Sequence, residues 1–250
     1  MQAVTLTDQG QVRAYNEDST NAVKNSLGEY LVVVADGMGG HKAGDVASAL
    51  AVESLQLSWK EEEAGFRPGR AEAWLLHTIQ QANETILSLS KEKPQYAGMG
   101  TTIVAAVCTN EFITIAHVGD SRAYLIGHDG LSQKTSDHSL VNELVKNGQL
   151  SEEEAEDHPR KNVLLRALGT DMNVKVDVHT FEWDEQDVAL FCSDGLTNKV
   201  SDTELQDVLN SNQMLKEKVA ELIRLANEAG GEDNITAAIV ENSPSSGSEV

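Results

Sequence analysis

The sequence predicts an α+β fold, a four-layer αββα sandwich of two antiparallel β-sheets flanked by helices. Two observations carry this prediction. Short β-branched segments follow one another between turn residues, and the helical patterns come in pairs instead of alternating strictly with strands. With 40% hydrophobic but only 4% aromatic residues, the core is expected to be aliphatic, without large aromatic anchors. We expect one domain over residues 1–242 and a disordered polar tail over 243–250.

Helical periodicity marks two segments in the first half of the chain and two near its end. Residues 45–60 and 71–90 are expected to be helices, and Pro94 ends the second one. The apolar positions of the second helix recur at steps of four and three residues: Leu75, Ile79, Ala82, Ile86 and Leu89. The last helix also has an apolar face, formed by Val219, Leu222, Ile223 and Ala226.

Strand patterns fill much of the remaining chain. The stretches GTTIVAAVCTN, EFITIAHVG and SRAYLIGHDG are expected to form consecutive antiparallel strands, a meander. Further strands are expected at LVVVADG, VKVDVHTF, DVALFCS and NITAAIV. The polar segment 138–165, broken by Gly148 and Pro159, is predicted to lie outside the sheets, with a short helix over Ser139–Asn147.

The charge of the chain excludes several classes of function. Forty acidic residues against nineteen Lys plus Arg give a net charge of −21, which argues against nucleic acid and anionic lipid as partners.

Cys108 and Cys192 sit in separate apolar runs, which predicts buried free thiols in a reducing compartment. No signal peptide or membrane-spanning run is evident, so a cytoplasmic protein is expected.

At four junctions the sequence places an aspartate at the end of an expected strand and close to glycine: VVVADG, IAHVGDS, ALFCSDG and GGEDNIT. Any single Asp-Gly pair is most often an ordinary turn. The repetition favours another interpretation, because strands of a sandwich end at common rims and their carboxylates then converge. Clustered carboxylates need a cation, and an all-oxygen set selects a hard divalent ion such as Mg²⁺ or Mn²⁺. The candidate residues are Asp36, Asp120, Asp194 and Asp233.

The N-terminal stretch GQVRAYNEDS adds three charged candidates. Glu17 and Asp18 are candidates to hold metal-bound waters. Arg13 suits a bidentate grip on a phosphate, although an isolated arginine is usually a surface residue. Four histidines form no closely spaced ligand pair and are expected to be packing or surface residues: His77, His117, His128 and His179. The role of His138, in the polar segment 138–165, stays open.

Seven ordered motifs resemble the metal-dependent type 2C protein phosphatases, the PPM family, in their bacterial serine/threonine phosphatase form. They are RAYNED, VVVADGMGGHKAGDVAS, GMGTT, VGDSRAY, NVLLRALG, LFCSDGLT and GGEDNIT, from Gly10 to about Val240. The resemblance implies two Mn²⁺ or Mg²⁺ ions and hydrolysis of phosphoserine and phosphothreonine in proteins. It also implies direct attack by a water that bridges the two ions, with no covalent intermediate.

The resemblance assigns the metal ligands by position. Asp36 would bridge the two ions and Gly37 would bind through its carbonyl oxygen. Asp194 and Asp233 would complete the first site. Asp120 matches the position that bacterial members use, together with Asp194, for a third and looser ion.

The remaining assignments concern substrate and partners. Arg13 matches the phosphate-binding arginine and His41 the general acid, while Thr135–Leu168 matches a mobile flap beside the active site. The implied counterpart is a bacterial membrane-spanning serine/threonine kinase and its targets, and a monomer is expected. A cysteine phosphatase is excluded, because Thr114 and Asn198 stand where its arginine is required six residues after each cysteine. The alternative from another class is a non-catalytic module that docks phosphorylated partners.

Overall fold

Two antiparallel sheets form the centre of the protein in the computed structural model, which describes residues 1–39, 43–156 and 158–243. The first sheet has the strand order β1 (Gln2–Asp8), β11 (Ile235–Glu241), β10 (Val188–Cys192), β7 (Arg122–Gly127) and β8 (Gly130–Gln133). The second has the order β2 (Asp18–Lys24), β3 (Tyr30–Met38), β5 (Ile103–Cys108), β6 (Phe112–Val118) and β9 (Asp177–Glu182), with the short β4 (Gly100–Thr101) paired to β3.

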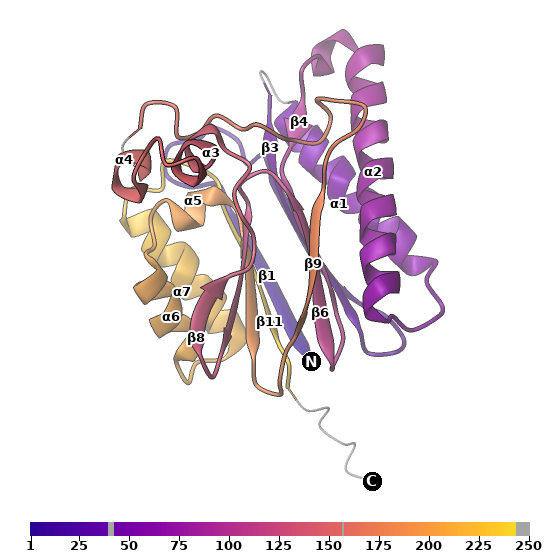
Figure 1. Cartoon of the computed structure of the whole chain (residues 1–250), viewed down its shortest axis with the longest axis vertical. Helices are drawn as coiled ribbons and strands as arrows, with labels where there is room; N and C mark the ends of the chain where they lie inside the picture. The colour runs from indigo at the N-terminus through magenta and orange to yellow at the C-terminus, as the bar shows by residue number, and fades with distance from the viewer. Residues whose placement is uncertain (40–42, 157, 244–250) are drawn as a thin grey trace.

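Helices cover the outer face of each sheet (Figure 1). The second sheet carries α1 (Gly44–Lys60) and α2 (Pro68–Glu92), which a short 3₁₀ turn, η1 (Pro94–Tyr96), follows. The first sheet carries α5 (Asp194–Thr197), α6 (Asp202–Asn210) and α7 (Leu215–Glu228). In the described part of the chain, no helix has the length and apolar character needed to cross a membrane. The predicted four-layer α+β fold is confirmed.

Three separate hydrophobic cores hold the four layers together. Strand β3 shows why its sequence is a continuous apolar run: Leu31 and Val33 face the helices α1 and α2, whereas Val32 and Val34 face the other sheet. Because alternate side chains of a strand point to opposite faces, a strand buried on both sides must be apolar throughout. The third core lies between the first sheet and α5–α7.

Aromatic residues contribute more to the core than the composition predicted. The Trp59 side chain is buried, and its ring stacks on Phe66 with centroids 5.2 Å apart. Trp74 packs edge-on against Trp59 at 5.6 Å, and the Arg70 guanidinium lies 4.5 Å from the centre of the Phe66 ring. The expectation of a core without aromatic anchors was therefore wrong at the α1–α2 connection.

The predicted meander was wrong in one respect. Strands β5 and β6 form an antiparallel pair as expected, but β7 belongs to the other sheet and pairs with β10 and β8. The chain therefore crosses between the sheets at Gly119–Ser121, where Gly119 has a φ of +104° that favours glycine. This crossing carries Asp120 to the end of both sheets.

The segment predicted as a flap, residues 135–168, contains α3 (Leu140–Lys146) and α4 (Glu152–Glu156). Figure 1 shows these two helices beyond the ends of the strands, above α5 and α6. Two isolated β-bridges tie the segment to itself and to the sheet, Ser139 with Leu164 and Leu168 with Thr101. The predicted helix over Ser139–Asn147 is confirmed, with the Ser139 side chain capping it by accepting the Asn142 N–H.

Candidate metal centre

One end of the sandwich gathers five aspartates, which we call the carboxylate cluster. Each of them stands where a strand ends or begins: Asp18, Asp36, Asp120, Asp194 and Asp233. Asp18 and Asp36 are directly opposite each other in the β2–β3 ladder. Asp194 begins α5 just after β10, and Asp233 precedes β11 by two residues. The predicted convergence of these strand ends is therefore present.

Asp36 lies at the centre of the carboxylate cluster. The charges of the other four members all act on its carboxyl group. Burial and then the neighbouring carboxylates hold the pKa of Asp36 well above its usual range. Charged carboxylates this close repel one another, and a bound cation would relieve that repulsion.

The other members of the cluster show the same electrostatic strain. Burial raises the pKa of Asp18 to about 7, against hydrogen bonds from Thr236 and Ser193 that stabilise the charged form. Burial also raises the pKa of Asp120 to about 7, and the charge of Asp194 adds to the effect. Solvent still reaches part of Asp36, Asp120, Asp194 and Asp233, so the site is recessed but open.

Among the described residues, two buried oxygens of the cluster have no hydrogen-bond partner, Asp18 Oδ1 and Asp194 Oδ1. An unpaired buried carboxylate oxygen is costly, and a bound ion is one of the explanations for such a group. The donor set is oxygen only, which suits a hard divalent cation such as Mg²⁺ or Mn²⁺. The residues present therefore fit the metal ions that the sequence implied.

Hydroxyl groups next to the aspartates form a supporting layer that the sequence analysis missed. The Thr102 hydroxyl accepts the Asp36 N–H at 3.0 Å and bonds the Ser121 hydroxyl at 2.6 Å. The Ser193 hydroxyl donates to Asp18 Oδ2 at 2.7 Å. The sequence could have indicated these hydroxyl groups, because their residues belong to the motifs GTT, GDS and CSD.

Glycines allow α1 to begin directly against β3. A Cβ on Gly37 would stand 2.1 Å from the Gly44 carbonyl oxygen, and a Cβ on Gly44 would stand 2.6 Å from Glu17 Oε1. The Gly37 N–H donates to the Glu17 carbonyl at 3.1 Å. The Gly44 N–H also bonds the Glu17 side chain, whose pKa burial nonetheless raises. Glu17 and Gly37 therefore lie together beside Asp36.

Arg13 lies on the rim of the cluster. Its Nη2 donates to Asp233 Oδ2 at 2.8 Å, and this bond raises the pKa of the guanidinium further. The Arg13 side chain is 51% exposed, so the ion pair fixes its position more than it stabilises the fold. The other catalytic candidate, His41, lies outside the described residues.

Two histidines that the sequence analysis left unpaired lie together outside the cluster. The rings of His117 and His138 stack with centroids 4.6 Å apart, and His138 Nε2 is 3.2 Å from Asp177 Oδ2. One possible ligand atom from each of His117, His138 and Asp177 lies within 4.8 Å of the other two. Arg166 already supplies a cation there, 3.0 Å from Asp177 Oδ1. A metal ion at this trio would have to displace that guanidinium.

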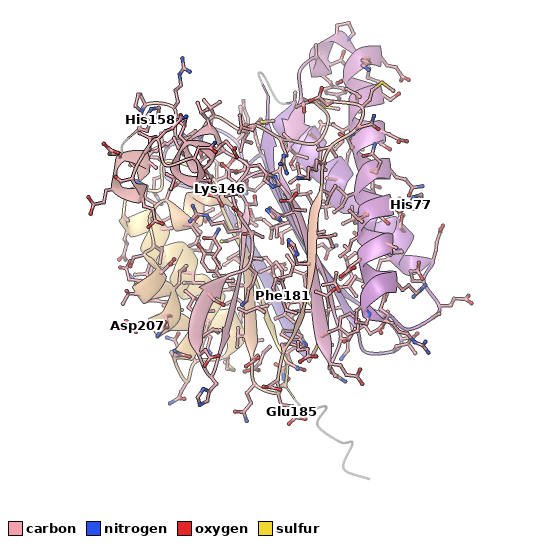
Figure 2. All side chains as sticks on the ribbon, viewed as in Figure 1. His77, Lys146, His158, Phe181, Glu185 and Asp207 are labelled. Atoms are coloured by element: carbon pink, nitrogen blue, oxygen red, sulfur yellow. The ribbon has the colours of Figure 1, made fainter. Side chains whose placement is uncertain are left out.

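Two other histidines and both cysteines lie where the sequence analysis expected them. His77 and His128 are exposed, and Figure 2 shows His77 pointing away from the sheets on the outer side of α2. Cys108 and Cys192 are buried free thiols, and burial raises the pKa of the Cys192 thiol to about 12. Neither cysteine is suited to be a nucleophile.

Several known proteins are similar to this chain in sequence and in fold. A family model described as protein phosphatase 2C matches residues 9–239. The serine/threonine phosphatase stp of Listeria monocytogenes is 48% identical over 241 residues, 96% of each chain. The serine/threonine phosphatase of S. agalactiae superposes with a TM-score of 0.90 at 42% identity, covering 95% of this chain and 98% of that one. The catalytic domain of PstP, solved with two manganese ions, has a TM-score of 0.83 at 34% identity, covering 96% and 97%. The chain therefore belongs to the protein phosphatase 2C family.

Proposed function

We propose that the chain is a protein-serine/threonine phosphatase that hydrolyses phosphoserine and phosphothreonine with the help of divalent metal ions. The observation that carries the proposal is the carboxylate cluster, whose two unpartnered oxygens and raised pKa values favour binding of a cation at neutral pH. Similarity to named serine/threonine phosphatases over nearly the whole chain supports the same reaction. The PstP catalytic domain, solved with two manganese ions, supports the choice of Mn²⁺, with Mg²⁺ as the alternative.

The proposed ligands are those implied by the motifs. Asp36 and the Gly37 carbonyl would hold two ions together with Asp194 and Asp233, and Asp120 would contribute to a weaker third site. When bound, such ions would lower the pKa of a bound water, so that it loses a proton near neutral pH and can attack phosphorus directly. Glu17 and Asp18 would accept hydrogen bonds from waters of the ions.

The other residues would act on the phosphate and the leaving group. One N–H group of Arg13 bonds Asp233, which keeps the planar guanidinium at the mouth of the site, where its other N–H groups suit phosphoryl oxygens. Attack by water requires no nucleophilic side chain. The serine or threonine alkoxide leaves poorly, and His41 would donate the proton it needs, a contribution of roughly 10² to 10⁴ in rate.

The wider role follows from kinship with bacterial enzymes. We propose that the substrates are phosphoproteins of a bacterial membrane-spanning serine/threonine kinase system and that the chain acts as a cytoplasmic monomer. The net charge of −21 disfavours nucleic acid as a partner.

Hydrolysis of p-nitrophenyl phosphate with and without Mn²⁺ tests the proposal. The wild type should release nitrophenol only with metal, and Asp194→Asn should lose nearly all of that activity while keeping its circular dichroism spectrum. A folded protein that binds Mn²⁺ and a phosphopeptide but releases no product would instead be a docking module.

A further inference from the structure

We propose that His138 is a positioning residue for Asp120, because it holds both polar backbone groups of the neighbouring Gly119. The inference rests on the proposed function, in which Asp120 contributes to metal binding. It concerns the contact between the predicted flap, which contains His138, and Gly119, which precedes Asp120. The contacts that support it lie outside the carboxylate cluster.

Gly119 is held from two sides by one residue. The His138 main-chain N–H donates to the Gly119 carbonyl at 2.9 Å, and the Gly119 N–H donates to His138 Nδ1 at 3.2 Å. Gly119 sits in the crossing between the sheets with a φ of +104°, and a Cβ there would lie 2.6 Å from Thr102 Cγ2. Asp120 is the next residue, so these two bonds fix the direction in which its side chain leaves the crossing.

The acceptor role of Nδ1 requires one particular tautomer of His138. A neutral imidazole carries one proton, and because Nδ1 accepts the Gly119 N–H, that proton is on Nε2. Nε2 lies 3.2 Å from Asp177 Oδ2, to which it donates, and 3.1 Å from Arg166 Nη1, which bonds Asp177 Oδ1 instead. Burial lowers the pKa of His138 to about 4, which keeps the ring neutral and Nδ1 free of a proton at neutral pH. Asp177 therefore acts on the Gly119 N–H through the ring between them.

The same connection joins both ends of the flap. His138 lies near its beginning and stacks on His117 of β6. At the other end Arg166 bonds Asp177 Oδ1 at 3.0 Å, and the Leu165 N–H donates to the His138 carbonyl at 2.7 Å. A displacement of either end of the flap would therefore reach the backbone that carries Asp120.

The Gly119–His138 contact has a direct spectroscopic signature. In ¹⁵N-labelled wild-type protein, the N–H···N bond should give a scalar coupling between the Gly119 amide nitrogen and His138 Nδ1. The Nε2 resonance should show an attached proton. Asp177→Ala, a substitution at a partly exposed position, should weaken that coupling because it removes the acceptor that fixes the tautomer.

Two substitutions at His138 distinguish the bond from the Gly119 N–H to Nδ1 from the bond between Nε2 and Asp177. His138→Asn keeps an acceptor oxygen where Nδ1 stands but cannot reach Asp177, whereas His138→Gln reaches further and places no acceptor at the δ position. We expect Asn to retain slow hydrogen exchange of the Gly119 amide and Gln to lose it. His179→Ala, an exposed histidine on the same strand as Asp177, is the matched control and should change nothing.

The effect on function is measured as the affinity for Mn²⁺ and as the separate changes in kcat and KM. Loss of a residue that orients a metal ligand typically costs about 10- to 100-fold in metal affinity or activity. His138→Gln should therefore weaken the weakest Mn²⁺ site in calorimetry by about tenfold or more and lower kcat, with KM for p-nitrophenyl phosphate unchanged. His138→Asn should retain most of both.

Two results would overturn the inference: no coupling between Gly119 and His138 in the wild type, or Gln and Asn variants with the same Mn²⁺ affinity as the wild type. The spectra and the calorimetry need no turnover. A wild type that shows the coupling but hydrolyses no phosphate ester would therefore refute the proposed function alone.

Discussion

Asp36 is the residue on which the proposed metal centre depends most, because its carboxyl group is buried among four others. Burial and this repulsion raise its pKa, so metal-free protein at neutral pH either keeps a proton there or carries unfavourable charge. Binding of a divalent ion removes both penalties. Function and stability therefore oppose each other at this position when metal is absent.

Asp36→Asn should accordingly stabilise the metal-free protein while abolishing activity. The amide keeps the shape and removes the charge, and each kcal/mol of repulsion relieved should raise the Tm by about 2–4 °C for a chain of this size. Thermal melts in EDTA, with and without the substitution, check the prediction. A lower Tm for the variant would show that the carboxylate stabilises the empty site instead.

His41→Ala should affect substrates unequally. Its loss should slow hydrolysis of a phosphoserine peptide by roughly 10² to 10⁴, but that of p-nitrophenyl phosphate far less, because nitrophenolate leaves without a proton. Rates of both substrates at one pH and one Mn²⁺ concentration provide the measurement. Equal losses on the two substrates would remove His41 from the role of general acid.

Single residues of the site were predictable where the same pattern, an aspartate at the end of a strand, recurs along the chain. The aspartates stood out because each lies at or close to one end of a strand, and a shared sheet edge brings such residues together. The pairing of His117 with His138 was not predictable in this way. The two residues are brought together by the return of the chain after β8, and nothing in their spacing shows it.

At the scale of elements, the first turn of α1 supports one side of the candidate centre. The helix begins so close to β3 that Gly37 and Gly44 leave no room for a side chain between them. The Ser48 hydroxyl of the same helix donates to the Glu17 carbonyl at 2.6 Å. These contacts hold Glu17 and Gly37 beside Asp36.

Gly44→Ala should therefore disturb both stability and metal binding. The added methyl group would overlap Glu17 Oε1 and the Gly37 carbonyl, and overpacking of this kind costs about 1–3 kcal/mol. Gly69→Ala in α2 is the matched control, since a Cβ there meets nothing within 4 Å and alanine favours a helix. Denaturant unfolding with and without Mn²⁺ compares the two. Equal stability of both variants would contradict the tight approach of α1 to β3.

Elements with strong local patterns were predictable, and those defined by long-range pairing were not. The helix expected over 71–90 is α2, because its apolar stripe repeats on one face. Strands β1 and β2 were not predicted, since each forms an edge of its sheet and carries polar residues on an open side. The crossing from β6 to β7 was also missed, because a local sequence does not state which sheet a strand joins.

For the whole molecule, the raised pKa values predict an unusual dependence of stability on pH. The folded state gives Asp18 and Asp120 pKa values of about 7, whereas an unperturbed aspartate has 3.8. Between these values the folded protein binds more protons than the unfolded chain, so its free energy of unfolding falls as pH rises from about 4 to about 7. The net charge of −21 acts in the same direction.

Metal-free protein should therefore melt at a higher temperature near pH 5.5 than near pH 8. Saturating Mn²⁺ should reverse the order, because the ions bind the deprotonated carboxylates of the folded state only. Thermal melts at the two pH values, in EDTA and in Mn²⁺, check both signs. The reverse order in EDTA would mean that the clustered carboxylates are not strained in the empty site.

The most direct test of the proposed metal centre is the rate of phosphate release from a phosphothreonine peptide across a Mn²⁺ titration, in wild type and Asp36→Asn. The wild type should be inactive in EDTA and gain activity with Mn²⁺ until the sites are filled, and the variant should stay inactive throughout. Release of phosphate that is independent of metal, or a variant as active as the wild type, would contradict the role of the carboxylate cluster.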